Sequence, residues 1–217
     1  MLKKLRRWAI FTFVFGGFVL LLSGQWTSPI VLTLVTGMSA IVLYAMLAME
    51  SDLASERFRP PSRGEDPIAL VFIRLAALGV LVVAPLDARF HWSPALPTAV
   101  RVGAVAGTLG AFLLCFHAMV TNRYFSAVIR IQDDRGHGVV DSGPYAVVRH
   151  PGYVGMSLGV PLTAIALGSL WGFAFGIAYS LLMVRRAAKE DRFLRANLAG
   201  YADYAGRVRF RLLPGVW

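Results

Sequence analysis

Long apolar stretches with almost no charged residues constrain this chain more than any other feature. A helix needs about 20 mostly apolar residues to cross the hydrocarbon core of a bilayer. Stretches that approach or reach this length occupy residues 8–23, 30–49, 68–86 and 99–120, and a longer one occupies residues 153–184. Only 16% of the residues are charged, whereas soluble domains contain about a quarter. We therefore expect a multi-pass integral membrane protein.

The stretch at residues 153–184 is too long for one ordinary span. Gly168, Ser169 and Gly172 lie near its middle, and such residues favour a break in a helix. We interpret it as a hairpin of two shorter helices; one long tilted helix is the alternative and would place the C-terminus on the other side. The expected fold is all-α: a polytopic transmembrane helical bundle of five to six segments, followed by a cytosolic C-terminal helix within residues 185–211.

The basic residues are distributed unevenly along the chain. If the N-terminus is inside, the inner segments are 1–7, 50–67, 121–152 and 185–217, which contain 4, 3, 4 and 8 Lys and Arg residues, or 19 of the 22. Short loops on the cytoplasmic side carry such an excess. We expect cytosolic N- and C-termini and assign the net charge of +10 to topology and contact with anionic lipids. This reading excludes nucleic acid as a partner and suits a bacterial plasma membrane.

Two regions are expected to differ in role. Residues 1–120 are interpreted as transmembrane scaffold helices, with an irregular connector over residues 50–67 that contains Pro60-Pro61. Residues 121–217 combine a polar loop, the membrane hairpin and the C-terminal helix, and form the expected catalytic region. Arg74 lies in a span of the scaffold. Its side chain either extends to the inner interface or contacts a ligand, because charges inside membranes are commonly functional.

Several common chemistries lack the residues that they need. The sequence contains no H-E-x-x-H pair and only one cysteine, so no zinc site is expected. The phosphate-binding sequence G-x-x-x-x-G-K-[ST] is absent. The pattern G-x-S-x-G occurs at residues 155–159, but inside an apolar stretch and not at a turn between a strand and a helix, so no nucleophile elbow is expected. No G-x-G-x-x-G follows a predicted strand, which argues against a soluble dinucleotide-binding fold.

Polar residues remain in two places of the C-terminal half. Residues 137–155 read HGVVDSGPYAVVRHPGYVG, and Glu190-Asp191 follow the last apolar stretch. Pro151 disfavours helical geometry at His150, so a helix is expected to begin there, with Arg149 and His150 at its start. Irregular backbone at this depth is tolerated where it lines a cavity. From chemistry alone, Arg149 and His150 are explained equally well as interfacial polarity.

The run from Asn122 to Pro214 resembles the isoprenylcysteine carboxyl methyltransferase family of membrane methyltransferases. The matching pattern is H-x-[LV]-V-x-x-G-P-Y-x-x-x-R-H-P-x-Y-x-G, followed by an acidic pair, by Tyr201-x-x-Tyr204 and by Pro214. The acidic pair is Glu-Asp here, where the family pattern has two glutamates, and this leaves the role of Asp191 open.

The resemblance implies an S-adenosylmethionine-dependent methyltransferase, acting as a carboxyl O-methyltransferase on a lipophilic or isoprenylcysteine-like carboxylate. Small lipophilic or lipid-linked substrates and membrane lipids are the implied partners, without a metal. It also implies that Arg149 and Glu190 are catalytic. The cofactor pocket would be formed by His137, Val139, Val140, Tyr145, His150, Pro151, Tyr153 and Glu190, with Asn122 as a weaker candidate.

Methyl transfer from a sulfonium needs alignment and a dry cavity more than an acid or a base, which accounts for the lack of a catalytic dyad. Two other enzyme classes remain open. An NADPH-dependent membrane reductase of the sterol-reductase-like type has a similar R-H-P-x-Y-x-G turn, and a phospholipid amine N-methyltransferase is a close relative. A non-catalytic protein that keeps the fold is the third alternative. The sequence leaves the methyl acceptor and the oligomeric state open.

Overall fold

The computed structural model describes residues 1–49 and 66–217, and every regular element in this part of the chain is helical. The long helices are α1 (Leu2–Ser23), α2 (Pro29–Ala48), α4 (Pro67–Phe90), α5 (Thr98–Thr121), α6 (Pro151–Leu167) and α7 (Leu170–Asn197). A short helix α8 (Tyr201–Arg207) and the 3-10 turns η1 (Asp133–Arg135) and η2 (Gly143–Ala146) lie outside this bundle.

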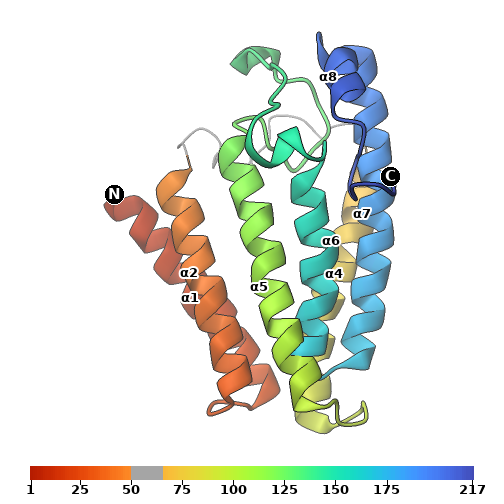
Figure 1. Cartoon of the computed structure of the whole chain (residues 1–217). Helices are drawn as coiled ribbons and strands as arrows, with labels where there is room; N and C mark the ends of the chain where they lie inside the picture. Colours follow the sequence, from red (N-terminus) through yellow and green to blue (C-terminus); the bar gives the residue numbers. More distant parts are fainter. Residues whose placement is uncertain (50–65) are drawn as a thin grey trace.

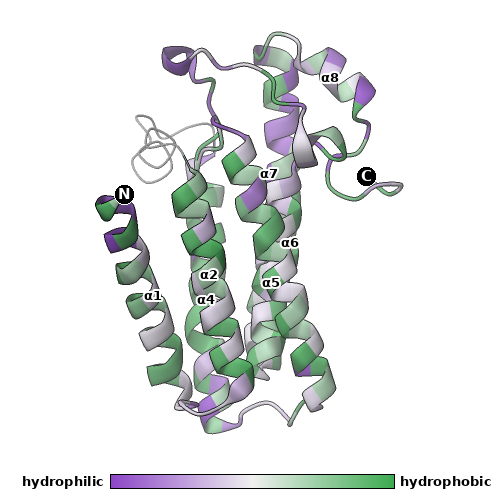
Figure 2. Cartoon of the chain, turned by 60° about the vertical axis from the view of Figure 1, so that its left-hand side comes forward, coloured by the Kyte–Doolittle hydropathy of each residue, from purple (hydrophilic) through white to green (hydrophobic). Residues whose placement is uncertain are grey.

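The six long helices run alternately in opposite directions and form a bundle (Figure 1). Helix α5 packs along α6 and α2, while α7 packs along α6 and α4. The irregular segment 122–150 and helix α8 lie at one end, which we call the polar end, and both chain termini lie toward it (Figure 1). Hydrophobic residues cover the helices, and hydrophilic ones gather at the polar end (Figure 2).

Helices α1, α2, α4 and α5 are long and apolar enough to cross a membrane, and α6 is a shorter apolar helix. Proline occupies the first turn of α2, α4 and α6, where its missing N–H costs no helical hydrogen bond. The predicted polytopic helical bundle is therefore confirmed.

A break at Gly168 and Ser169 separates α6 from α7. Gly168 ends α6 with a φ of 89°, a left-handed conformation that favours glycine. The Ser169 hydroxyl then accepts a hydrogen bond from the Gly172 N–H at 2.8 Å and so caps the first turn of α7. The same hydroxyl donates to the buried Asp87 carboxylate of α4 at 2.6 Å. The predicted hairpin is thus confirmed, and the alternative of one long helix is wrong.

Glycines bring the helices that carry the site into close contact. A Cβ atom on Gly155 would clash with the Ala111 carbonyl and the Cys115 side chain of α5, and one on Gly176 would lie within 2.5 Å of Pro161 of α6. Such contacts between backbones require residues without side chains. The relative positions of α5, α6 and α7 are therefore fixed sterically.

The end of α5 at Thr121 coincides with the boundary expected between scaffold and catalytic region, and that division stays a prediction. Helices on both sides of the boundary pack against one another, α5 along α6 and α4 along α7. The connector expected at residues 50–67 lies, up to residue 65, outside the described residues.

Topology reporters fused near Ser28, Gly143 and Trp217 test the orientation of this bundle. Six alternating helices and the excess of basic residues at the polar end predict an outside signal at the first site and inside signals at the other two. Alkaline phosphatase and green fluorescent protein fusions report the two sides. An outside signal at Trp217 would contradict the orientation expected for the hairpin.

Candidate functional site

A cavity of about 360 Å³ opens between the polar end of the bundle and its apolar interior. Volumes of this order are typical of small-molecule sites. The wall nearer the polar end, which we call the upper wall, comes from segment 122–150, the end of α7 and helix α8. The wall farther from the polar end, which we call the lower wall, comes from α4, α6 and α7. The apolar lower wall includes Ile73, Ala77, Met156, Tyr179 and Met183. One cavity therefore combines a polar half with an apolar half.

Most of the residues implied by the sequence resemblance surround this cavity. It is lined by Asn122, His137, Val139, Val140, Tyr145, Arg149, His150, Tyr153 and Glu190. Pro151 is the exception, because it is buried at the first position of α6 and does not line the cavity. Its visible contribution is to start the helix. The structure brings the other residues together, and their roles as ligand contacts stay predictions.

The His137 imidazole is held in one tautomer. Its Nδ1 accepts a hydrogen bond from the Gln132 backbone N–H at 3.2 Å, so Nδ1 carries no proton and Nε2 carries it in the neutral ring. The ring also packs against Tyr124, with 4.5 Å between centroids. Burial lowers the pKa of His137 below its ordinary value. We conclude that His137 is neutral at pH 7, with its Nε2–H as the remaining donor.

Tyr153, Glu190 and Arg186 form a partly buried polar group where α6 faces α7. The Tyr153 hydroxyl donates a short hydrogen bond to Glu190 Oε2. Arg186 Nε donates to the Tyr153 hydroxyl oxygen at 3.1 Å, and Arg186 Nη2 donates to the Ala127 carbonyl at 2.9 Å. All three residues line the cavity. Arg186 Nη1 makes no hydrogen bond within the described part of the chain and is available as a donor.

Arg186 is not among the site residues predicted from the sequence. It belongs to the basic residues of segment 185–217, which were assigned to membrane topology. Its spacing of four from Glu190 could have indicated it, since residues four apart lie on one face of a helix. Only 4% of Arg186 is exposed, which is unusual for arginine unless it is paired.

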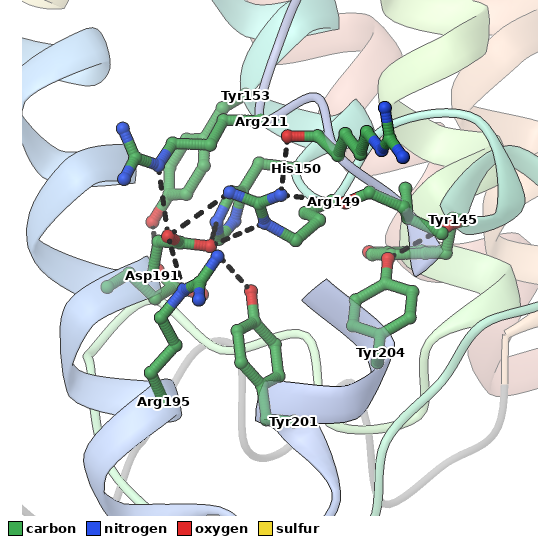
Figure 3. A network of polar contacts seen from close by, with 12 residues as sticks. Tyr145, Arg149, His150, Tyr153, Asp191, Arg195, Tyr201, Tyr204 and Arg211 are labelled. Carbon is green, nitrogen blue, oxygen red and sulfur yellow. Dashed lines mark hydrogen bonds and ion pairs between the residues drawn. The ribbon is translucent and has the colours of Figure 1, made fainter. Parts of the chain in front are cut away.

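A second polar group, which we call the Asp191 cluster, consists of Asp191, Arg149, Arg195, Tyr201 and Arg211 (Figure 3). Asp191 is fully buried. Arg149 approaches its two oxygens with Nε at 2.6 Å and Nη2 at 3.2 Å. Arg211 Nε, the Tyr201 hydroxyl and Arg195 Nε donate to the same carboxylate at 2.9, 3.1 and 3.3 Å. This one carboxylate therefore joins the end of α7 to three other parts of the chain.

The charge state of Asp191 follows from these contacts. Burial alone would raise the pKa of its carboxyl, but the neighbouring His150 and hydrogen bonds from Arg149 and Arg211 lower it well below the ordinary value of aspartate. Burial raises the pKa of the Tyr201 hydroxyl, and the negative charge of Asp191 adds to the rise. Asp191 is therefore ionised and Tyr201 protonated at neutral pH.

Arg149 was predicted to be catalytic. Its guanidinium N–H groups, however, donate to acceptors within the protein. Beyond the two bonds to Asp191, its Nη1 donates to the carbonyls of Val208 and Arg209 at 2.7 and 2.8 Å. The Arg149 and His150 backbone N–H groups donate to Phe210 and Arg211 carbonyls, both at 3.0 Å. With four side-chain hydrogen bonds already formed, Arg149 is better placed to hold the C-terminal segment over the cavity than to bind a ligand carboxylate bidentately.

No group of three or more His, Cys, Asp or Glu side chains that could hold a metal ion exists among the described residues. The side chains around the cavity are instead suited to hydrogen bonding and charge pairing with an organic ligand.

Comparisons with known proteins identify relatives of the part of the chain that builds this site. The model of the isoprenylcysteine carboxyl methyltransferase family matches residues 104–196. A probable protein-S-isoprenylcysteine O-methyltransferase of Oryza sativa is 30% identical over 109 residues, which cover 49% of this chain and 57% of that protein. The protein-S-isoprenylcysteine O-methyltransferase B of Arabidopsis thaliana is 28% identical over 102 residues, covering 46% and 52%.

A third relative has a different name. The cobalt-zinc-cadmium resistance protein CzcN of Cupriavidus metallidurans is 31% identical over 83 residues, covering 36% of this chain and 37% of that protein. The present chain spans about half the length of the plant proteins that it matches. The family resemblance predicted from the sequence is confirmed.

The substitution Asp191→Asn tests the Asp191 cluster. It keeps the shape of the side chain but leaves the buried Arg149 charge unpaired, which costs about 3–5 kcal/mol where a buried pair is broken. We expect a clearly lower melting temperature of the purified protein in detergent. Asp141→Asn is the matched control, because the Asp141–Arg207 ion pair is more than half exposed and such pairs contribute little. Equal melting temperatures of the two variants would contradict this account.

The lowered pKa of Asp191 also predicts how the wild-type protein responds to acid. Below about pH 4 an aspartate in the unfolded chain takes up a proton, while folded Asp191 stays ionised. The stabilisation from this carboxylate is therefore fully present above about pH 4 and is lost progressively as the pH falls further. In a melting series from pH 6 to pH 3, Asp191→Asn should decline less steeply than the wild type. Parallel curves would refute the assignment.

Proposed function

Because residues 104–196 match the isoprenylcysteine carboxyl methyltransferase family, we propose that this integral membrane protein is an S-adenosylmethionine-dependent carboxyl O-methyltransferase. Its acceptor is a lipophilic carboxylate of the isoprenylcysteine type. The observation that carries the proposal is the single cavity that joins a polar half at the bundle end to an apolar half between α4, α6 and α7. A polar cofactor and a hydrocarbon-tailed acceptor can meet only in a site of this dual character.

The polar half suits the proposed cofactor. Glu190 supplies a carboxylate for the cofactor's amino group or ribose hydroxyls, and the His137 Nε2–H supplies a donor, while Val139 and Val140 offer apolar contact. His150 also lines this half, with its Nε2 atom 3.6 Å from the Asp191 carboxylate.

The apolar half suits a hydrocarbon tail. Ile73, Ala77, Met156 and Met183 line it, and they lie on helices whose outer faces are apolar (Figure 2). Lipid tails are about as apolar as these side chains, so moving an acceptor tail from the bilayer into the cavity changes the free energy little. Discrimination between acceptors whose tails fit the cavity must therefore come from the polar head.

Arg186 is the residue that we assign to orienting the acceptor carboxylate. Tyr153 and Ala127 hold its guanidinium through Nε and Nη2, which leaves Nη1 as a fixed donor beside the cavity. A preorganised guanidinium pairs strongly with a carboxylate. The carboxylate is already ionised at pH 7, so no general base is needed. Bound S-adenosylmethionine would supply the methyl group for a carboxylate oxygen, and its sulfur would keep the bonding pair. What the protein contributes is alignment and exclusion of water.

Binding of S-adenosylhomocysteine to the purified protein, measured by calorimetry, tests the cofactor. Saturable binding is expected. Glu190→Gln removes a charge-assisted hydrogen bond worth about 1.5–3 kcal/mol and should weaken binding by about 10- to 100-fold. Asp203→Asn, at an exposed position on α8, is the control and should bind like the wild type.

NADPH titrated in the same experiment separates the proposed activity from a reductase. Saturable binding of NADPH, with no binding of S-adenosylhomocysteine, would overturn the methyltransferase assignment. If neither molecule binds to folded protein, the enzymatic proposal fails as a whole.

A further inference from the structure

Arg74 is an exposed cation on the apolar helix α4. It lies seven residues beyond Pro67, the first residue of α4, or about 10 Å along the helix axis at 1.5 Å per residue. It lines the same cavity as Arg186 and Glu190. It makes no hydrogen bond or ion pair with any described residue. An arginine at membrane depth is costly, roughly 2.5–3.5 kcal/mol at a helix centre on insertion scales, so an anion is expected to approach it.

The packing of α4 against α7 gives the level of Arg74 relative to Arg186. The two helices are antiparallel: Asp66 pairs with Lys189 at 3.5 Å, Gly79 lies against the Phe175 ring, and Gly172 lies against Ala84. By interpolation the Arg74 Cα is level with Leu181, which is about five residues, or about 7 Å, from Arg186 along α7.

Side-chain direction reduces this separation. Helical side chains lean toward the N-terminus of their own helix. The N-terminus of α4 is at the polar end and that of α7 is at the opposite end (Figure 1). The Arg74 side chain therefore leans toward the polar end and the Arg186 side chain away from it. Both side chains therefore lean toward a common level along the cavity that they line.

We propose that Arg74 is a specificity-determining residue that binds the carboxylate of a lipid-tailed acceptor where the apolar half of the cavity meets the polar half. This inference rests on the proposed methyltransferase function and adds to it the element that selects an anionic head. Arginine suits this task, because its planar fork matches the two oxygens of a carboxylate.

The charge of Arg74 also separates substrate from product. The acceptor enters as an anion and, after its carboxylate is methylated, leaves as a neutral ester. The hydrocarbon tail has about the same free energy in the cavity as in the bilayer. The ion pairs that the carboxylate makes with Arg74 and Arg186 are therefore the contacts that differ between acid and ester. The acid is therefore retained and the ester released.

The test is binding of N-acetyl-S-farnesyl-L-cysteine and of its methyl ester to purified protein in phosphatidylcholine nanodiscs. The acid is an anion and the ester is neutral, with the same tail. The variants are Arg74→Gln, Arg74→Met, which is of similar length, and Arg74→Lys. Arg185→Gln is the matched control, because Arg185 is exposed on α7 and does not line the cavity. Binding of S-adenosylhomocysteine to each variant reports that the site is folded.

The wild type should prefer the acid over the ester by at least tenfold. Arg74→Gln and Arg74→Met should lose most of this preference by weakening acid binding about tenfold, with ester and S-adenosylhomocysteine binding unchanged. Arg74→Lys should keep part of the preference, and Arg185→Gln should behave as the wild type. A preference that survives in both Arg74→Gln and Arg74→Met overturns the proposal, as does a wild type that binds S-adenosylhomocysteine but not the acid.

A nanodisc series with added phosphatidylglycerol addresses the remaining source of negative charge. If Arg74 contacts only lipid phosphate, the difference in binding between the variants and the wild type will change with the phosphatidylglycerol content and not with the charge of the acceptor. That result also overturns the proposal. Failure of the wild type to bind S-adenosylhomocysteine is a different result, because it refutes the methyltransferase function itself.

Discussion

The carboxylate of Asp191, which has no contact with solvent, holds the polar end of this bundle together. Its two oxygens accept hydrogen bonds from Arg149, Arg195, Arg211 and Tyr201. These donors belong to the segment just before α6, the end of α7, the C-terminal segment and α8. Buried charges are costly unless they are paired and hydrogen-bonded, so the whole set must form together. Loss of any one contact affects the position of the others.

The arrangement of the cavity depends on this carboxylate. Asp191 is adjacent in sequence to Glu190, and Arg149 is adjacent to His150, so the pairing of Asp191 with Arg149 brings both cavity-lining neighbours into place. Tyr204 adds a further link, because its hydroxyl donates to the Tyr145 carbonyl at 2.8 Å. A glutamate at position 191 would add a methylene group where no solvent-exposed space is left, and such overpacking is destabilising. This accounts for the shorter acid at the second position of the acidic pair.

Much of the fold could be predicted, because the bilayer allows few solutions for long apolar stretches. The six helices follow the apolar blocks, and Gly168 with Ser169 indicated the break between α6 and α7. Most of the expected site residues lie around one cavity because they belong to one short motif, whose proline begins a helix. In contrast, the roles of Asp191, Arg186 and Arg74 depend on which residues of α7 face α4, α6 and the C-terminal segment. A count of charges along the sequence contains no such information, so an arginine that sets topology and one that lines a cavity look alike.

The close glycine contacts between α4, α6 and α7 have a consequence for the evolution of this protein. Ala77 and Tyr179 are the cavity-lining residues farthest from the polar end along their helices. The contact of Gly79 with Phe175 lies about half a turn beyond Ala77, and that of Gly176 with Pro161 about one turn beyond Tyr179. Under the proposed function these contacts limit the length of the acceptor tail, because the Phe175 ring already lies on the α4 backbone at Gly79 and Pro161 lies on the α7 backbone at Gly176. Proteins that diverge toward other tail lengths are then constrained to vary the side chains between these contacts and the polar end, and they retain Gly79 and Gly176. Divergence in substrate length can thus proceed while the chemistry at the polar end stays untouched.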